Sequence, residues 1–149
     1  MYKHILVPTD GSKLSLKAAK EAAGLARSMK AKVTALFVVP PYMPPVMGDG
    51  YLPHNNDAAM RRYREAAAKL AGTALDKVEK VLAKSKVRCA RLSLTNDQPW
   101  AGIITAAKDR KCDVIVMASH GRGGLAGLLL GSETTRVLAH SKKPVLVCR

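Results

Sequence analysis

Short runs of Val, Ile and Leu alternate along the chain with longer segments rich in Ala and Lys. The apolar runs predict strands, and the longer segments predict helices because their apolar residues recur every three or four positions. The predicted strands cover residues 4–8, 32–38, 87–94, 113–117 and 144–148. The predicted helices cover 12–29, 57–85, 98–110 and 132–140, and each starts at or beside a residue that can cap or start a helix.

Four of the predicted strands are apolar at consecutive positions, which is typical of strands covered by helices on both faces of a parallel sheet. Strict alternation of strand and helix over 149 residues predicts a single domain, 1–149. Its expected architecture is a doubly wound, five-stranded α/β sheet with right-handed crossovers. The run 87–94 alternates polar and apolar residues instead, so we place it at or near an edge of the sheet.

Two segments between the strands have features of their own. In the longest predicted helix, apolar residues step by three or four along one face, and we expect that face to pack. Its members are Tyr63, Ala67, Leu70, Ala74, Val78 and Val81. The stretch from Pro40 to Pro53 holds five of the eight prolines and predicts a long loop after the second strand, either functional or a plain connector.

The chain is strongly basic, with 25 Lys and Arg against 11 Asp and Glu and a formal net charge of +14. A positive field suits nucleic acid, an anionic membrane surface or a phosphorylated small ligand, and it does not choose among them. Aromatic residues make up only 4%, so the stacking platforms of single-strand binders are missing. Contact with the backbone of double-stranded DNA stays open.

Location and redox state follow from what the sequence lacks. No apolar run approaches the length of a membrane span, and no secretory signal precedes the first strand, so we expect a soluble, cytoplasmic protein. Cys89, Cys112 and Cys148 lie far apart and form no C-x-x-C pair, which fits a reducing compartment and argues against structural zinc.

Candidate chemistry lies where the parallel strands end, because ligands of open α/β sheets bind outside the carboxyl ends of the strands. The first strand runs into Thr9, Asp10, Gly11 and Ser12. Asp10 could accept hydrogen bonds from a ribose diol, or serve only as a turn residue that holds its loop, while Ser12 could cap the following helix. Trp100 opens the third helix and is expected to pack rather than to bind a ligand.

The fourth strand runs into a glycine-dense loop, 118–131, that ends where the helix at Ser132 begins. Glycines let backbone N–H groups converge on an anion, and the helix directs its own N–H groups and positive dipole end to the same place. Arg122 would add a charged contact to phosphate. The alternative is a flexible surface loop.

Two familiar phosphate motifs do not account for this loop. A Walker-type G-x-x-x-x-G-K-[ST] is absent because the chain has no Gly-Lys pair. Gly121-x-Gly123-x-x-Ala126 mimics a dinucleotide fingerprint, but it follows the fourth strand and has no acidic residue about 20 positions later. P-loop NTPases are therefore excluded, and a nicotinamide dehydrogenase is not expected.

Four motifs follow one another along the chain: T-D-G-S after an I-L-V-P strand, then D-V-I-V-M-A-S-H-G-R-G-G-L, L-L-L-G-S and a final P-V-L-V strand. With them the chain resembles the universal stress protein family over nearly its whole length. The ATP-binding branch of that family carries G-x-x-G-x9-G-[ST], which falls here on Ala118, Gly121, Gly131 and Ser132 and matches at three of four positions. If the backbone at position 118 needs a positive φ, Ala118 would cost roughly 1 kcal/mol.

The resemblance implies a sheet of order 3-2-1-4-5, a homodimer formed through the last strand, Pro144 to Cys148, and a site for ATP, with Mg²⁺ where the phosphates require it. By this resemblance Asp10 holds the ribose or adenine side, framed by Pro8 and Thr9, and Val38 and Met117 line the adenine slot. The triphosphate would lie against Gly121, Arg122, Gly131, Ser132 and the backbone at Glu133. The Glu133 carboxylate would repel phosphate unless Mg²⁺ intervenes.

We therefore expect a universal stress protein that binds ATP or another adenine nucleotide and acts as a nucleotide-dependent switch. His120 is the only side chain of the loop suited to activate water, and it is expected to order the loop rather than to catalyse, so hydrolysis would be slow at most. Two alternatives stay open. One is a stress adaptor that binds no nucleotide and acts through an unidentified protein partner, and the other is a basic, nonspecific nucleic-acid binder.

Overall fold

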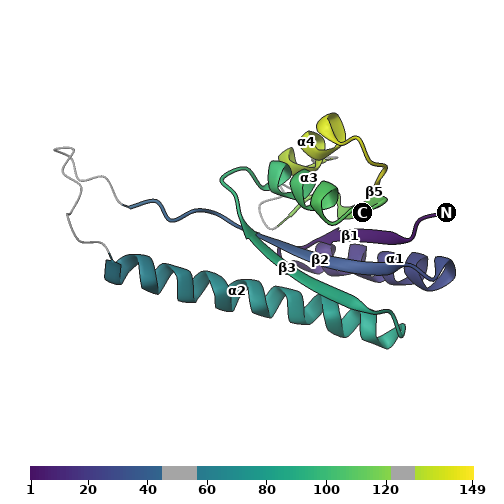
Figure 1. The fold of residues 1–149 in the computed structure, drawn as a ribbon, viewed down its shortest axis with the longest axis horizontal. Helices are drawn as coiled ribbons and strands as arrows, with labels where there is room; N and C mark the ends of the chain where they lie inside the picture. Colours follow the sequence, from purple (N-terminus) through teal and green to yellow (C-terminus); the bar gives the residue numbers. More distant parts are fainter. Residues whose placement is uncertain (45–56, 122–129) are drawn as a thin grey trace.

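The computed structural model describes residues 1–44, 57–121 and 130–149 of the chain (Figure 1). Strands and helices alternate along it as the sequence predicts. In chain order they are β1 (His4–Pro8), α1 (Lys13–Met29), β2 (Lys32–Val39), α2 (Asp57–Lys84), β3 (Cys89–Thr95), α3 (Pro99–Asp109), β4 (Val114–Ala118), α4 (Ser132–His140) and β5 (Val145–Cys148).

The five strands form one parallel sheet in the order β3-β2-β1-β4-β5. This arrangement confirms the doubly wound α/β fold. Strand order reverses at β1, where one crossover leads to β2 and the other half of the sheet begins with β4. The carboxyl ends of β1, β2 and β4 therefore meet at one edge, where this class of fold binds its ligands.

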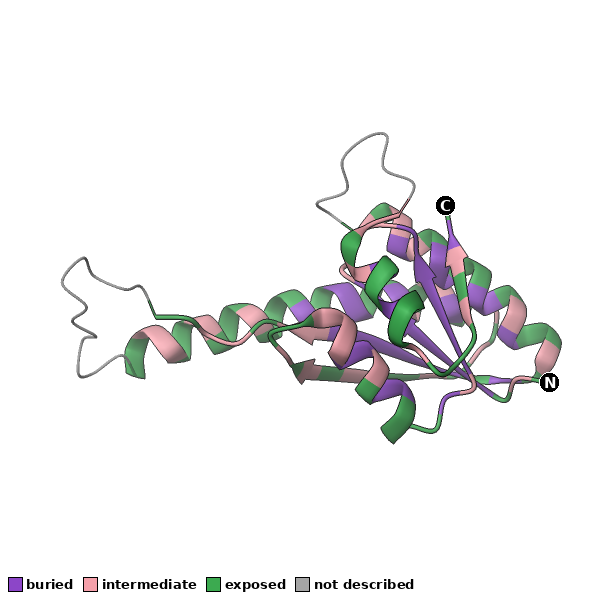
Figure 2. Ribbon diagram, turned by 90° about the horizontal axis from the view of Figure 1, so that it is seen from above, coloured by how far each residue is buried: buried purple, intermediate pink, exposed green. Residues whose placement is uncertain are grey.

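Helices cover both faces of the sheet, so the central strands are buried on both sides (Figure 2). Successive side chains of β4 show the two layers because strand residues alternate between faces. Val114, Val116 and Ala118 belong to the core beneath α1 and α2. Ile115 and Met117 belong to the second core, beneath α3 and α4.

The turn between β1 and α1 follows from three short side chains. Gly11 has φ 78°, a left-handed conformation that glycine adopts at least cost. Ser12 is the N-cap of α1, and its side chain accepts the Ser15 N–H at 3.2 Å, as its position in the sequence predicts. The turn therefore holds Asp10 at the carboxyl edge of the sheet with a fixed backbone.

The predicted packing face of α2 is wrong in part. Ala74 and Val78 are buried as expected, but the buried face also takes in Ala71, Leu75 and Leu82, while Leu70 is 45% exposed. Figure 1 shows the reason, because the amino-terminal half of α2 extends past the end of the sheet and has no sheet to pack against. The long helix thus anchors only through its second half.

The edges of the sheet and the segment after β2 follow their predictions. β3 lies at one edge, and its Arg91 is paired with Asp76 at 2.6 Å and with Glu79 at 3.3 Å, both in α2. Residues 40–44 form neither helix nor strand, as expected for the proline-rich loop, and residues 45–53 of that loop lie outside the described residues. Within the described ranges, no helix has both the length and the apolar character needed to cross a membrane.

Candidate functional site

A hollow of about 250 Å³ opens at the carboxyl edge of the sheet, between the ends of β1, β2 and β4 and the first turns of α3 and α4. Its wall combines polar residues from the β1 and β4 loops with apolar residues from the strands and α3. Seven of the predicted site residues line it: Pro8, Thr9, Asp10, Val38, Met117, Gly121 and Glu133.

Asp10 and Gly121 meet across this hollow although they are far apart in sequence. The Asp10 Oδ1 accepts the Ser12 N–H at 2.9 Å, which fixes the carboxylate in a local turn. Its Oδ2 lies directly over Gly121, since a Cβ at that position would stand only 2.7 Å from it. An ionised carboxylate only accepts hydrogen bonds, which suits the hydroxyl groups of a ligand.

Thr9 supports the turn rather than facing a ligand. Its hydroxyl accepts the Gly11 N–H at 3.0 Å and contacts the Ser15 hydroxyl at 2.9 Å, and its backbone N–H bonds to Leu36 in β2. The side chain is buried. Thr9 therefore holds the β1 turn against both α1 and β2, which sets the position of Asp10.

The other half of the hollow is apolar. Val38 and Met117 line it together with Pro99 and Ile103, which lie one helical turn apart on α3. α3 approaches the sheet closely, because a Cβ at Gly102 would stand 3.0 Å from Leu94 and 3.2 Å from Val38. The result is a slot with β2 and β4 on one side and α3 on the other, suited to a flat apolar ring.

Backbone hydrogen bonds close the neck of the glycine-dense loop. The Gly131 N–H donates to the Ser119 carbonyl at 2.7 Å, and the Ser119 N–H donates to the Cys148 carbonyl at 2.7 Å. The buried Thr134 hydroxyl donates to the Ala118 carbonyl at 2.9 Å. A Cβ at Gly131 would lie 3.1 Å from the His120 backbone, so the two ends of the loop fit together only without a side chain there.

Ala118 is the one position that departs from the family's phosphate motif, and the departure is cheap. Among the described residues, Ala118 is not one of those with positive φ, so the conditional strain penalty does not arise. Its methyl group belongs to the core beneath α1, on the face of the sheet opposite Met117. Ala118 also lines the hollow, so the extra carbon packs into the core at the border of the slot.

The Glu133 side chain connects the start of α4 to the start of α3. Its Oε2 accepts the Trp100 N–H at 2.8 Å, and its Oε1 lies 3.9 Å from Arg136. The N-cap of α3 is Gln98, whose side chain makes no capping bond, so Glu133 caps α3 from a neighbouring helix. The carboxylate is thus engaged at α3, while the first backbone N–H groups of α4 have no side-chain cap of their own.

The rings of Trp100 and His140 pack together near this cap. The Trp100 ring packs against the α3 and α4 core and lies 4.6 Å from the His140 ring between centroids, which confirms the expectation that it packs. Its buried Nε1 has no hydrogen-bond partner among the described residues.

His120 lines the hollow, with Nδ1 at 3.1 Å from the Ser119 hydroxyl.

The remaining predicted residues lie beside the hollow or outside the described ranges. Gly131 precedes α4 and Ser132 begins it, next to the lining residues Glu133 and Thr134. Arg122 lies outside the described residues. Sequence reasoning missed Pro99, Ile103 and Thr134. The first two carry a readable signal, since they stand four apart at the start of the helix that follows β3 at the same sheet edge.

No cluster of three or more His, Cys, Asp or Glu that could hold a metal ion occurs in the part of the chain that the structure describes. Its three cysteines are free. Burial and the nearby Asp113 carboxylate raise the pKa of the Cys112 thiol to about 11, so this thiol is not a ready nucleophile. None of the three cysteines lines the hollow.

Comparisons with known proteins agree with the fold and add a family. The sequence profile described as "Universal stress protein family" matches residues 1–149. Universal stress protein MJ0531 of Methanocaldococcus jannaschii is 35% identical over 149 residues, which cover 100% of this chain and 83% of that protein.

Solved structures show the same architecture. Universal stress protein UspA from Lactobacillus plantarum superimposes with a TM-score of 0.82 at 27% identity, covering 99% of this chain and 98% of that one. A universal stress protein in complex with cAMP superimposes with a TM-score of 0.73 at 23% identity, covering 99% and 97% of the two chains. The second likeness concerns the fold alone.

Proposed function

Because the chain belongs to the universal stress protein family, we propose that its hollow binds an adenine nucleotide, with ATP as the first candidate. The observation that carries the proposal is the meeting of Asp10 with Gly121 at the mouth of an apolar slot. An acid for the ribose, a ring-sized slot and a glycine turn beside a helix start form one continuous wall, and a nucleotide needs all three.

Each part of the nucleotide has a matching part of the wall. The adenine ring enters between Val38 and Met117, with Ile103 beneath it, and the ribose hydroxyls donate to Asp10. The phosphates lie along Gly121 and the start of α4 at Gly131 and Ser132, where first-turn N–H groups and the helix dipole favour negative charge. Arg122 supplies a cation from the loop. The Glu133 carboxylate, held at α3, leaves its backbone N–H for phosphate.

The residues present fit a polyphosphate because α4 starts beside Gly131 with no side-chain cap on its first backbone N–H groups. Mg²⁺, when bound with ATP, would offset phosphate charge and take its ligands mainly from phosphate and water. We infer a binding protein with slow hydrolysis at most, since His120 is the one titratable imidazole on the wall and it is paired with Ser119.

Strand register offers a route from the slot to the proposed dimer surface, so the bound nucleotide would act as a switch in the stress response. Met117 lines the slot and is the register partner of Val147 in β5. β5 is an edge strand, and its Leu146 is 45% exposed. A ligand that repositions Met117 acts on the strand through which we expect two copies to pair.

Isothermal titration calorimetry with ATP, ADP and AMP tests the proposal. Wild-type protein should release heat with at least one of them. Asp10→Asn should bind roughly 10-fold weaker or worse, because the amide keeps the turn acceptor but turns a donor toward the ribose. Asp109→Asn removes an exposed carboxylate at the far end of α3 and should bind like wild type.

The adaptor alternative predicts the opposite results. It requires no heat with any of the three nucleotides and no nucleotide in an acid extract of protein purified without added ligand. Equal affinities of wild type and Asp10→Asn would refute the role of Asp10 while leaving nucleotide binding in place.

A further inference from the structure

Three helices end in the same backbone motif, and each places a lysine where glycine is usual. After α1 the Ala31 N–H donates to Ala26 at 2.9 Å, after α2 the Val87 N–H donates to Leu82 at 3.1 Å, and after α3 the Cys112 N–H donates to Ala107 at 2.8 Å. These six-residue closures are Schellman motifs, which need a left-handed residue just before the last donor. That residue is Lys30, Lys86 and Lys111 in turn.

The three lysines are the only non-glycine residues with positive φ in the described part of the chain, at 53°, 57° and 52°. A left-handed backbone is strained for a residue with a Cβ, and glycine would relieve the strain. Lysine stands in this left-handed position at three successive helix ends, which brings three positive charges to one end of the molecule. Cations favour helix C-termini, but that preference extends over the whole last turn and does not require the left-handed position.

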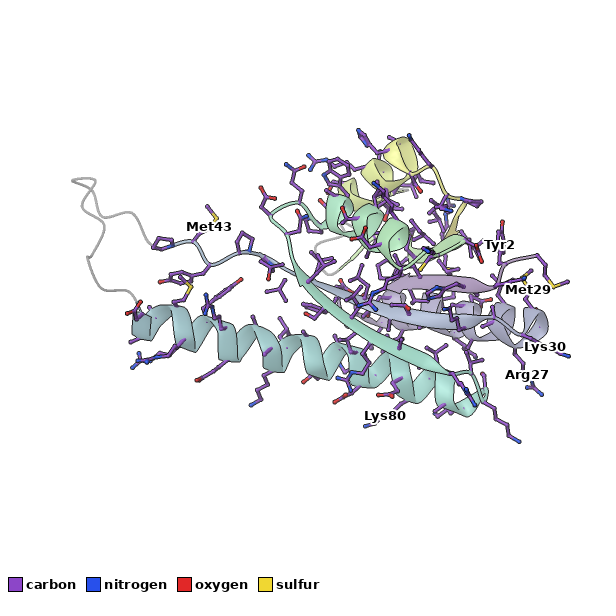
Figure 3. All side chains as sticks on the ribbon, viewed as in Figure 1. Tyr2, Arg27, Met29, Lys30, Met43 and Lys80 are labelled. Atoms are coloured by element: carbon purple, nitrogen blue, oxygen red, sulfur yellow. The ribbon has the colours of Figure 1, made fainter. Side chains whose placement is uncertain are left out.

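In a parallel α/β fold these helix ends all lie at the edge where strands begin, which we call the strand-start pole, opposite the nucleotide hollow. Figure 3 shows Arg27 and Lys30 with Tyr2 at that end of the molecule. Strand starts add Lys3, Lys32 and Arg88, and the last turn of α3 and the approach to β5 add Arg110 and Lys143. All of these cations are exposed.

Cations outnumber carboxylates on this surface. Arg27, Lys30, Lys32, Lys86 and Arg88 line one hollow of about 350 Å³ whose described lining contains no acid. Asp113 also lies at this end, where its Oδ2 accepts the Lys3 and His4 backbone N–H groups at 2.7 and 2.9 Å, and Asp109 ends α3. Each of these carboxylates offsets one positive charge. Among the described residues, no ion pair involves a cation of the strand-start pole.

We propose that the strand-start pole binds the phosphate backbone of a nucleic acid duplex without reading its bases. The five strands set the pole's length at about 19 Å, with about 4.8 Å per strand gap, so its cations form a row suited to a linear polyanion. No large apolar residue lines the basic hollow except Val87, which is half-buried, so a membrane surface has little apolar area to bind here. Tyr2 is the one aromatic residue at this end, so stacking on single strands has no platform.

Fluorescence anisotropy of a labelled 20-base-pair DNA duplex, measured between 50 and 200 mM KCl, tests the proposal. Wild type should bind with a log–log salt slope of about −5 or steeper, since each neutralised phosphate contributes about −0.9. The triple variant Lys30→Gly, Lys86→Gly, Lys111→Gly should bind at least ~10-fold weaker at 50 mM KCl, with a slope shallower by about 3.

A melting measurement and two further variants test whether the loss of binding comes from the charges at this pole, rather than from unfolding or from a lower total charge. The triple glycine variant should melt at the same or a higher temperature than wild type, because it relieves three strained positions. Arginine at the same three positions should restore binding. A matched control, Lys69→Gln, Lys77→Gln, Lys80→Gln, removes the same charge from the exposed side of α2 and should bind within about twofold of wild type.

Three outcomes would overturn the proposal. They are no binding by wild type at 50 mM KCl, an equal loss in the α2 control, or tighter binding to phosphatidylserine vesicles than to the duplex with the same lysine dependence. In calorimetry the triple glycine variant should bind nucleotide as tightly as wild type does, because the strand-start pole and the hollow lie at opposite ends of the strands.

Discussion

At the scale of single residues, the site includes two glycines at which a side chain would meet neighbouring protein atoms. Gly121 is needed because the Asp10 carboxylate occupies the space of a side chain. Gly131 is needed because the His120 backbone does the same. The two differ in what would have to move, since a carboxylate can rotate and a backbone cannot.

Gly121→Ala is therefore expected to separate binding from stability. The new methyl group would turn the Asp10 carboxylate away and weaken ATP binding about 10-fold or more. The free energy of unfolding should change by less than about 0.5 kcal/mol, because only the end of a side chain shifts. Calorimetry and urea unfolding measure the two effects.

Gly72→Ala is the matched control, because nothing lies within 4 Å of the position its Cβ would take. It should stabilise α2 by about 0.5–1 kcal/mol and leave nucleotide affinity unchanged. A loss of unfolding free energy in Gly121→Ala as large as the loss of binding free energy would contradict the separation.

His4 gives a pH dependence to stability. Burial, and then the nearby Lys32 cation, lower the pKa of its imidazole, whose Nε2 lies 2.8 Å from the Thr34 hydroxyl. The unfolded chain therefore takes up a proton more readily than the folded one, so stability is full above about pH 6.5 and falls as the pH drops below it. Urea unfolding at pH 7.5 and 5.5 should show this fall.

His4→Gln should flatten that dependence, since glutamine can bond to Thr34 but does not titrate. Asp113, whose pKa is lowered by the Lys3 and His4 N–H groups, loses its contribution only below the ordinary carboxyl range, so it does not interfere at pH 5.5. The same pH slope in His4→Gln and wild type would show that another group is responsible.

At the scale of helices and strands, the sequence predicted almost every boundary, because each central strand is apolar at consecutive positions and residues such as Ser12, Pro99 and Gly131 mark helix starts. The packed face of α2 was the exception. Leu70 continues an apolar stripe, but the sheet ends before that turn of the helix. Leu70 is therefore exposed because α2 is longer than the sheet it packs on. No local pattern reports where a neighbouring sheet ends.

The candidate site also has one contact that the sequence could predict and one that it could not. Asp10 and Gly121 could be predicted to meet, because parallel strands bring their carboxyl ends to one edge. The cap that Glu133 places on α3 could not, since it depends on how two helices lie side by side on one face of the sheet. Sequence spacing carries no information about that lateral packing.

Glu133→Ala should therefore destabilise α3 even though the residue lies in α4. Loss of the cap on the Trp100 N–H should lower the free energy of unfolding by about 1 kcal/mol. Glu133→Gln keeps an acceptor and should recover part of it. Urea unfolding measures both, and an unchanged value in Glu133→Ala would show that the cap contributes nothing.

At the scale of the whole molecule, parallel strands give the protein two chemically different ends. Strand ends and helix starts form the proposed nucleotide site, while helix ends and strand starts gather the basic residues. The sheet joins the two ends, and β5 forms one of its edges. The proposed duplex contact, nucleotide site and dimer edge therefore lie on separate surfaces.

Leu146→Asp tests the assembly. In a symmetric dimer formed through β5 the substitution occurs twice near the axis, so repulsion should raise the dimer dissociation constant at least ~10-fold in analytical ultracentrifugation. Leu70→Asp, equally exposed at 45% but on α2, should sediment as wild type does. If Leu146→Asp leaves the sedimentation profile unchanged, the copies do not pair through β5.

The link between Glu133 and Trp100 has a practical consequence. The chain has a single tryptophan, and its backbone is tied to the first turn of the helix that borders the phosphate cradle, while its ring rests on His140. Any displacement of that helix by an arriving anion changes the surroundings of the indole. The protein thus has an intrinsic fluorophore beside its proposed ligand site, and an emission scan during titration would follow occupancy without a label.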